Sequence, residues 1–179
     1  MPSANTATFL QRAVERELDF CVRVNHTCSA PLLRRFFALV SRLGDGIFWY
    51  TLMLSLPFIY GMGALAVSGI MIAVGVIDLL LYKLIKHLTG RQRPCAVNEK
   101  ICLGAPPLDH YSFPSGHTLH AIAFTIIAVF HIPELAIILI PFAALVAASR
   151  VILGLHYPTD VAAGVALGSG VASLALYLI

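Results

Sequence analysis

A series of five apolar segments limits what this chain can fold into more than any other feature of its sequence. One of them, residues 64–86, would be about 35 Å long as a continuous helix, which is enough to cross the hydrocarbon core of a bilayer. Hydrophobic residues make up 59% of the 179 residues and charged residues 12%, whereas a soluble domain carries about 25% charged residues. The sequence therefore predicts an all-α fold, a polytopic transmembrane helical bundle with about five spans. The predicted spans are residues 46–61, 64–86, 115–131, 134–154 and 158–179.

The first 45 residues differ from the rest, because charges alternate with apolar positions at helical spacing. Residues 5–25 and 31–43 each place apolar side chains on one stripe, and neither segment can span a bilayer. Such helices lie in the plane of the membrane interface. We therefore expect an amphipathic interfacial arm over residues 1–45 and a transmembrane domain over residues 46–179.

Small residues recur every four positions in the last predicted span, at Gly164, Gly168 and Ala172. This spacing is typical of a helix face that approaches a neighbouring helix closely. Packing within the chain is a simpler explanation of this face than a dimer contact.

Three short motifs place cations, histidines or a helix-start signal at the ends of predicted spans. They are Lys86-x6-Arg93-Pro94, Pro114-Ser115-Gly116-His117 and Ser149-Arg150-x5-His156-x3-Asp160. Ionisable residues beside a membrane span are costly to keep there, so they are functional candidates. Because successive spans cross the membrane in opposite directions, we expect all three motifs at the same membrane face.

The motifs contain the groups needed to hold a phosphoryl group. Lys86, Arg93 and Arg150 can bind phosphate oxygens, and an arginine can do so with two parallel hydrogen bonds. Ser115 and Gly116 open a helix whose free backbone N–H groups can bind an anion, and Ser115 adds a hydroxyl donor. Such positioning and electrostatic stabilisation account for most of the catalysis of phosphoryl transfer.

Two histidines remain for the steps that make and break bonds. Asp160 follows His156 by four residues, so it can bond one imidazole nitrogen and fix the tautomer in which the other nitrogen attacks phosphorus. His117 can then protonate the leaving oxygen. We therefore predict that His156, His117 and Asp160 are catalytic residues.

Each motif also has a structural interpretation when it is taken alone. Lys86, Arg91 and Arg93 suit a helix end, where cations complement the helix dipole and the lipid headgroups. Asp160 suits a helix start, where a carboxylate complements the dipole. Ser115 can act only as a helix cap. These interpretations do not explain why all of these residues gather at one face of so apolar a protein, so the functional interpretation is preferred.

Ionisable residues outside the motifs receive other assignments. We expect His120 to be structural, and Asp109 to lie at the surface of its loop. Asp78 lies within a span and is expected to pair with a motif cation, with Tyr82 or with Lys83. A metal site is not expected, because the motifs hold one carboxylate and an excess of cations.

The same residues resemble the type 2 phosphatidic acid phosphatase superfamily, which is marked by these three motifs in this order. Every fixed position is matched, and the motif-bearing core covers about residues 64–179. The resemblance implies a transmembrane phosphatase domain that needs no metal or other cofactor. It also implies a covalent phosphohistidine on His156, with His117 as the general acid. The implied phosphate ligands are Lys86, Arg93, Ser115, Gly116 and Arg150.

We therefore expect an integral-membrane enzyme that hydrolyses a lipid phosphate or polyprenyl diphosphate of the phosphatidic acid, phosphatidylglycerol phosphate or undecaprenyl diphosphate type. A lipid phosphotransferase that uses the same intermediate is one alternative. A non-enzymatic, anion-binding transporter or scaffold is another. The expected partners are the lipid phosphate and the bilayer. The small net charge of +3 carries no nucleic-acid signature.

The resemblance and the charge distribution favour opposite orientations in the membrane. Bacterial members of the family usually carry the site on the outer face of the inner membrane. With five spans, however, all Lys and Arg residues lie at the active-site face, and the turns at 61–64 and 131–134 have none, which favours the inside. Because catalysis holds several of these cations in place, we expect the periplasmic face. There Cys95 and Cys102 either form a disulfide or remain two free thiols.

Overall fold

The computed structural model describes residues 4–179, and this part of the chain contains helices and loops but no strands. The long helices are α1 (Ala4–Asn25), α2 (Pro31–Arg42), α3 (Phe48–Tyr60), α4 (Ala64–Thr89), α6 (Gly116–His131), α7 (Ala136–Ile152) and α8 (Pro158–Leu178). The short helical segments are η1 (His26–Ser29), η2 (Leu43–Ile47), α5 (Pro94–Val97) and η3 (Pro133–Leu135). The predicted all-α fold is confirmed.

Local sequence signals set the ends of the helices that carry the motifs. Helix α4 ends at Gly90, whose φ of 58° is a left-handed conformation that glycine adopts without steric cost. Helix α6 begins after Ser115, whose side chain accepts a hydrogen bond from a backbone N–H of the first turn. Helix α8 has Pro158 in its first turn, and its Asp160 accepts a 2.8 Å hydrogen bond from the N–H of Tyr157. These signals fix where the ionisable side chains of the motifs enter the structure.

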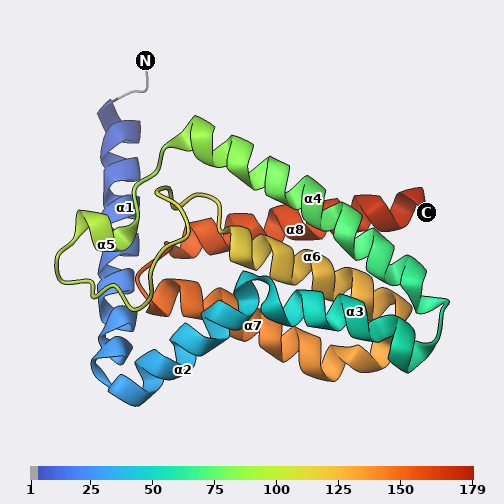
Figure 1. The fold of residues 1–179 in the computed structure, drawn as a ribbon. Helices are drawn as coiled ribbons and strands as arrows, with labels where there is room; N and C mark the ends of the chain where they lie inside the picture. Colours follow the sequence, from blue (N-terminus) through green and yellow to red (C-terminus); the bar gives the residue numbers. More distant parts are fainter. Residues whose placement is uncertain (1–3) are drawn as a thin grey trace.

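Helices α3, α4, α6, α7 and α8 run alongside one another as a bundle, and α6 contacts α4, α7 and α8 (Figure 1). Helix α1 lies across one end of this bundle, near the loop that carries α5 (Figure 1). Helix α2 leads back from that end and packs against α7. The end covered by α1 is where α4 and α7 finish and where α6 and α8 begin, so all three motifs lie there.

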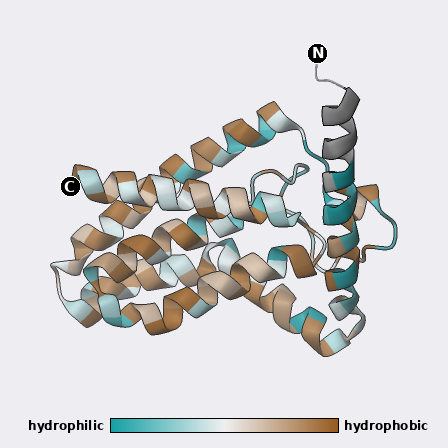
Figure 2. Ribbon diagram, turned by 180° about the vertical axis from the view of Figure 1, so that it is seen from behind, coloured by the Kyte–Doolittle hydropathy of each residue, from teal (hydrophilic) through white to brown (hydrophobic). Residues whose placement is uncertain are grey.

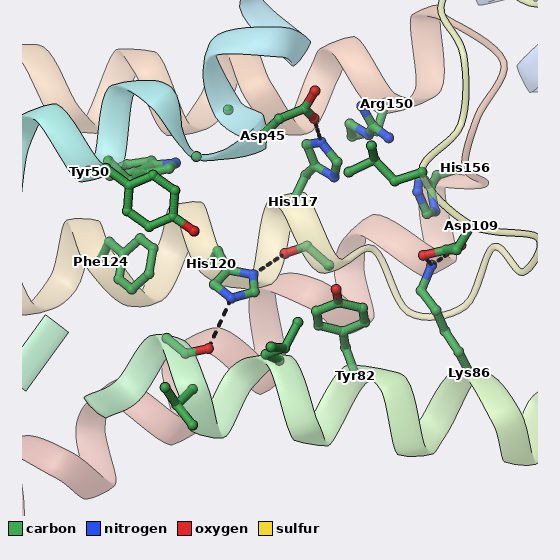
Figure 3. Close-up of a pocket in the computed structure, with 18 of the residues that line it drawn as sticks. Asp45, Tyr50, Tyr82, Lys86, Asp109, His117, His120, Phe124, Arg150 and His156 are labelled. Carbon is green, nitrogen blue, oxygen red and sulfur yellow. Dashed lines mark hydrogen bonds and ion pairs between the residues drawn. The ribbon is translucent and has the colours of Figure 1, made fainter. Parts of the chain in front are cut away.

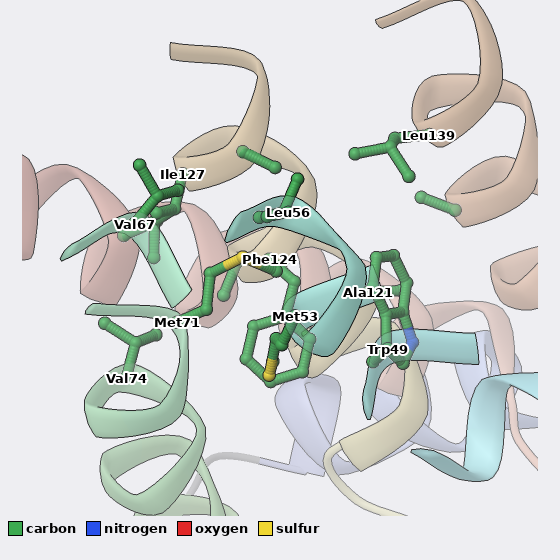
Figure 4. Packing of buried hydrophobic residues seen from close by; sticks show 14 of the residues in the cluster. Trp49, Met53, Leu56, Val67, Met71, Val74, Ala121, Phe124, Ile127 and Leu139 are labelled. Atoms are coloured by element: carbon green, nitrogen blue, oxygen red, sulfur yellow. The ribbon is translucent and has the colours of Figure 1, made fainter. Parts of the chain in front are cut away.

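Large apolar side chains fill the core between the bundle helices (Figure 4). Trp49, Leu56, Met71, Ile127 and Leu139 are each at most 1% exposed. Burial of one such side chain stabilises the fold by about 1.5–3 kcal/mol. The core therefore ties α3, α4, α6 and α7 to one another directly below the motif end.

The outer surface of the bundle is also apolar. Phe58 and Ile137 are 88% and 81% exposed, and Figure 2 shows hydrophobic colouring along the outside of the bundle helices and hydrophilic colouring on much of α1. An apolar surface of this kind is unfavourable in water and favourable in lipid. The outside of the bundle is therefore suited to the hydrocarbon core of a bilayer.

Among the described residues, three stretches are long and apolar enough to cross a membrane: Ala64–Val97, which contains α4 and α5, Pro133–Ile152, and Pro158–Leu178. The apolar helix α6 is shorter, and α3 has 13 residues. The polytopic helical membrane fold is thus confirmed, whereas the count of five spans stays a prediction. The division at residue 45 also stays a prediction, and it falls within η2, which joins α2 to α3.

The stripe of small residues in α8 packs against α6. A Cβ atom added to Gly164 would lie 2.7 Å from the backbone oxygen of Ser115, and one added to Gly168 would lie 2.4 Å from that of Leu119. Only glycine permits so close an approach of the two helices. The predicted role of this face in packing within the chain is confirmed, and the contact holds the start of α6 next to the start of α8.

Candidate active site

The three motifs meet around one cavity of about 290 Å³, which lies between η2, α3, α4, α6, the end of α7 and two loops (Figure 3). Six of the predicted site residues line it: Lys86, Arg93, Gly116, His117, Arg150 and His156. Ser115 and Asp160 do not line the cavity and lie fully buried behind it. The predicted convergence of the motifs is therefore confirmed, while the chemical role of each residue stays a prediction.

His156 is almost completely buried, with a side chain 1% exposed. Its Nε2 lies 3.2 Å from Nη1 of Arg93, and its Nδ1 lies 3.5 Å from Oδ2 of Asp160. Within the described residues Nδ1 has no hydrogen-bond partner, and a small movement would let it donate to Asp160. Burial lowers the pKa of His156 well below its ordinary value, and the positive charges of Arg150 and Arg93 lower it further. The imidazole is therefore neutral, which is the form that attacks phosphorus.

Arg91 holds the carboxylate of Asp160 from the other side. Its Nη1 donates to Oδ1 of Asp160 at 2.6 Å, and its Nη2 donates to Oε2 of Glu17 at 2.8 Å. The guanidinium also stacks over the ring of Tyr157, at 3.9 Å from the ring centroid. Glu17 in α1 accepts two further hydrogen bonds from Thr159, at 2.6 Å each. The N-terminal helix is thus joined to the start of α8 through the same group of side chains.

Sequence reasoning treats Arg91 as one more cation at a helix end and therefore misses this role. A signal was nevertheless present. Asp160 lies at the start of an apolar segment, where a carboxylate needs a fixed positive partner, and the structure shows its side chain to be 0% exposed. Arg91 lies within the first motif, between Lys86 and Arg93, which made it a candidate for that partner.

Lys86 and Arg93 converge on one carboxylate from the loop, that of Asp109. The Nζ of Lys86 lies 2.8 and 2.9 Å from the two carboxylate oxygens, and Nη2 of Arg93 lies 2.8 Å from Oδ1. Arg93 also donates to the backbone oxygen of Leu155 at 2.7 Å. The side chain of Asp109 is 38% exposed, as expected for its loop, but the expectation missed that its charge neutralises two cations that are 7% and 5% exposed in their side chains.

The pKa of Asp109 reflects this position. Partial burial alone would raise the pKa, but the hydrogen bond and charge of Lys86, together with the charge of Arg93, lower it below the ordinary value. Asp109 is therefore ionised at neutral pH. An anionic carboxylate between two cations occupies the kind of place that a phosphate group takes.

Arg150 supplies the third cation from the end of α7 and is 2% exposed. Its Nη1 donates to the hydroxyl of Ser41, and within the described residues its Nε has no partner. The backbone oxygen of Arg150 accepts hydrogen bonds from the N–H groups of Leu155 and His156 at 3.1 and 3.0 Å. The turn that carries His156 is thus folded back on Arg150, and the guanidinium keeps donor capacity for a ligand in the cavity.

Ser115 acts as a helix cap in this structure. Its Oγ lies 2.9 Å from Oγ1 of Thr118 and accepts a hydrogen bond from the Thr118 N–H at 3.4 Å. Its own N–H donates to the backbone oxygen of Asp160 at 3.0 Å, which ties the second motif to the third. Gly116 lines the cavity, so the first turn of α6 faces the ligand space. The predicted role of Ser115 as a phosphate donor stays a prediction.

His117 projects into the cavity from α6, and its Nε2 donates to Oδ1 of Asp45 (Figure 3). Asp45 lies in η2, outside the three motifs, and no sequence spacing relates it to His117. His120, one turn further along α6, has ring nitrogens 2.9 Å from the backbone oxygen of Gly116 and 3.2 Å from that of Gly75. His120 therefore joins α6 to α4, in agreement with its predicted structural role.

Asp78 does not take part in the cavity. It is 0% exposed, and neither carboxylate oxygen has a hydrogen-bond partner among the described residues. The expected pairing of Asp78 with a motif cation, Tyr82 or Lys83 is therefore wrong. The first-motif cation Lys86 instead bonds to Asp109, from the loop.

Two further expectations concern cysteines and metals. All four cysteines are free thiols, with Cys95 partly buried and Cys102 exposed, so Cys95 and Cys102 form no disulfide here. Within residues 4–179, no three His, Cys, Asp or Glu side chains come together in a way that could hold a metal ion. Chemistry without a metal stays a prediction.

Comparison with known proteins assigns the motif-bearing part of the chain to a family. A sequence model of the PAP2 superfamily matches residues 63–179. A decaprenylphosphoryl-5-phosphoribose phosphatase from Mycobacterium tuberculosis is 40% identical over 93 residues, which cover 51% of this chain and 49% of that protein. This chain thus spans about half the length of the curated relatives it matches.

Two solved structures share the fold over nearly the whole chain. One is the crystal structure of a transmembrane PAP2 type phosphatidylglycerolphosphate phosphatase from Bacillus subtilis, with a TM-score of 0.70 and 29% identity over 93% of this chain and 86% of that one. The other is Aquifex aeolicus LpxE, with a TM-score of 0.74 and 26% identity over 89% of this chain and 94% of that one. The likeness includes helices well beyond the motifs.

Proposed function

Because this chain belongs to the PAP2 superfamily, we propose that it is an integral-membrane phosphatase that hydrolyses a lipid phosphate or a polyprenyl diphosphate without a metal. The observation that supports this most strongly is that two histidines, His117 and His156, share one cavity with Lys86, Arg93 and Arg150. Cations alone would suit any anion-binding membrane protein. Two histidines, each beside a carboxylate, add a nucleophile and an acid.

The cations bind the phosphoryl group. Lys86, Arg93 and Arg150 contact its oxygens, and the free N–H groups of the first turn of α6 at Gly116 add neutral donors. Charge that builds up on the equatorial oxygens during transfer is stabilised by these fixed groups. The carboxylate of Asp109 leaves Lys86 and Arg93 as the phosphate arrives.

His156 then forms the covalent intermediate. The lone pair on Nε2 forms a bond to phosphorus while the bond between phosphorus and the leaving oxygen breaks, and His117 gives that oxygen a proton. Asp160 accepts a hydrogen bond from Nδ1 and compensates the positive charge that develops on the ring, and Arg91 holds Asp160 in place. Water next attacks the phosphohistidine and gives a proton to His117, so inorganic phosphate leaves and both histidines return to their starting state.

The apolar wall of the cavity supports a lipid substrate. It is formed by side chains of α3, α4 and α6, which include Trp49, Met53, Ile72, Val76 and Phe124. A polar end with three cations and an apolar wall beside it suit a phosphate attached to a hydrocarbon chain. The names of similar proteins include decaprenylphosphoryl-5-phosphoribose and phosphatidylglycerolphosphate phosphatases. Phosphatidic acid, phosphatidylglycerol phosphate and undecaprenyl diphosphate are therefore the substrate types to test first.

We place the protein in a bacterial inner membrane with the cavity at the periplasmic face. The interfacial arm over residues 1–45 belongs to this proposal, because α1 lies across the motif end of the bundle (Figure 1). An amphipathic helix in that position would rest at the level of the lipid headgroups, where the phosphate of the substrate also lies.

Phosphate release from a panel of lipid phosphates by the purified protein tests the function. We expect release with at least one lipid, no loss of activity in EDTA, and inhibition by vanadate. His156→Ala, handled identically, should release nothing. Formation of a phosphorylated acceptor in place of free phosphate would identify a phosphotransferase. Binding of lipid phosphates without any turnover would favour a transporter or scaffold, and restoration of activity by Mg²⁺ after EDTA would reveal a metal site.

A further inference from the structure

The carboxylate of Asp45 faces the proposed general acid from a segment outside the three motifs. Its Oδ1 accepts a hydrogen bond from Nε2 of His117 (Figure 3). The side chain of His117 is 9% exposed and that of Asp45 is 33% exposed. The two residues are 72 positions apart in sequence, so the tertiary fold brings them together.

The backbone of η2 is adapted to present this side chain. Gly46 has a φ of 138°, which residues with a side chain rarely adopt, and a Cβ atom there would lie 2.6 Å from the ring of Tyr50. A Cβ atom on Gly44 would lie 3.0 Å from Val146 of α7. Glycine on both sides thus lets η2 pack against its neighbours with Asp45 at the cavity. Segment η2 is therefore a kink between α2 and α3, with non-helical dihedral angles at Gly46.

Asp45 has no evident structural task in the described part of the chain. Among the described residues, the one hydrogen bond and the one ion pair found for its side chain are both the contact with His117. Arg150 and Lys86 line the same cavity but do not bond to it. The geometry of this carboxylate is therefore explained by its contact with the histidine.

We propose that Asp45 is a positioning residue that holds His117 in the orientation and charge state needed to donate a proton. The proposal rests on the proposed function, because it takes His117 as the general acid. By accepting a hydrogen bond from the Nε2–H group, Asp45 leaves Nδ1 to face the leaving oxygen. The negative charge of Asp45 also offsets the positive charge of Arg150 on the same cavity wall. Together with the charge of the bound anionic substrate, it lets the His117 ring carry two protons.

The proton balance of the two steps follows from this arrangement. In the first step, the Nδ1 proton of the doubly protonated ring moves to the leaving oxygen, and the ring becomes neutral with its Nε2 proton still bonded to Asp45. In the second step, water gives a proton to Nδ1 as it attacks the phosphohistidine, which restores the doubly protonated ring. Asp45 stays ionised throughout and exchanges no proton.

The test compares two leaving groups. A lipid alkoxide is strongly basic and needs the proton, whereas p-nitrophenolate leaves without it. General acid catalysis contributes about 10²–10⁴-fold, so Asp45→Asn should reduce turnover of the lipid phosphate about 10–100-fold and turnover of p-nitrophenyl phosphate only a few-fold. Asp45→Ser, which removes the carboxylate with less bulk, is measured beside it. Glu134→Gln, an exposed carboxylate in η3, is the control and should leave both activities unchanged.

A double-mutant cycle separates positioning from a general structural effect. If Asp45 acts through His117, adding Asp45→Asn to His117→Ala should cause no further loss. A further loss in the double variant, or equal losses of the Asp45 single variants on both substrates, would overturn the proposal while leaving the phosphatase function intact. Equal losses of His117→Ala itself on both substrates would show that the assumed acid is wrong, which is a failure of the proposed mechanism at His117.

Discussion

Replacing Asp109 with asparagine should tighten the binding of phosphate, because the carboxylate of Asp109 occupies the two cations that the substrate needs. Lys86 and Arg93 both lie 2.8 Å from Oδ1 of Asp109. An asparagine has nearly the same shape but no charge, so it leaves the cations unneutralised and favours an incoming anion. The pKa of Asp109 is lowered by these cations. Its charge is therefore present above the ordinary pKa of a carboxyl group, and is lost only as the pH falls through the lower, folded value.

The size of the effect follows from the exposure of this contact. Hydrogen bonds between charged groups contribute about 1.5–3 kcal/mol when buried, and exposed ion pairs about 0.2–1 kcal/mol. The side chain of Asp109 is 38% exposed, so we expect an intermediate value of about 1–2 kcal/mol. Since about 1.4 kcal/mol is a factor of ten in affinity, phosphate should bind about 5–30-fold more tightly to the variant.

The assay is inhibition of p-nitrophenyl phosphate hydrolysis by inorganic phosphate and by vanadate. Asp109→Asn should lower both inhibition constants, whereas Glu99→Gln, an exposed carboxylate in the same loop, should change neither. If Asp109→Asn weakened inhibition, the carboxylate would be organising the cations for phosphate instead of competing with it. An unchanged inhibition constant would show that the contact with Lys86 and Arg93 is too weak to matter.

Three other predictions concern parts of the structure around the cavity. Arg91→Gln removes the partner of the buried Asp160 and should lower turnover on both lipid and nitrophenyl substrates. Arg23→Gln changes an exposed arginine of α1, the helix that carries Glu17, and should change neither; full activity of Arg91→Gln would show that Asp160 does not need this partner. Gly168→Ala should lower the thermal midpoint of unfolding by the equivalent of about 1–3 kcal/mol, because its Cβ would lie 2.4 Å from the backbone oxygen of Leu119. Gly170→Ala has open space around its Cβ and should leave the midpoint unchanged. Equal midpoints for the two variants would contradict the close packing of α6 and α8. If the cavity is periplasmic, a membrane-impermeant maleimide should label the exposed Cys102 in intact cells. It should not label a cysteine introduced as Met62→Cys, in the turn between α3 and α4 at the other end of the bundle. The reverse pattern would place the cavity at the cytoplasmic face.

The convergence of the three motifs could be predicted from the sequence for a simple physical reason. Lys86, His117 and Arg150 each lie at the end of an apolar helix. Because successive helices cross the membrane in opposite directions, these ends lie at the same membrane face. The spacing of Gly164 and Gly168 also indicated that the last helix approaches a neighbouring helix closely, and the structure shows that this neighbour is α6. Helix ends and glycine spacing are set by residues close together in the chain, so the sequence alone reveals them.

Contacts made across the fold left no such signal. Asp45 reaches His117 from a kinked segment with a positive φ at Gly46, and neither apolar periodicity nor motif spacing predicts which way a side chain in such a kink will point. Asp109 lies in a loop without periodicity, so its bond to two buried cations became visible only in three dimensions. For Asp78 the sequence predicted a contact that is not made. A carboxylate within a span was expected to have a partner, but neither of its oxygens has one among the described residues.

Trapping a phosphohistidine on His156 tests the central claim most directly. The purified protein is mixed with a lipid phosphate that carries radioactive phosphorus and is quenched in alkali, which preserves phosphohistidine, and the labelled peptide is then identified. The account predicts that label appears on the peptide that contains His156 within a single turnover, that it decays as inorganic phosphate is released, and that His156→Ala acquires none. Release of phosphate at a normal rate without label on His156, or equal labelling of His156→Ala, would contradict it.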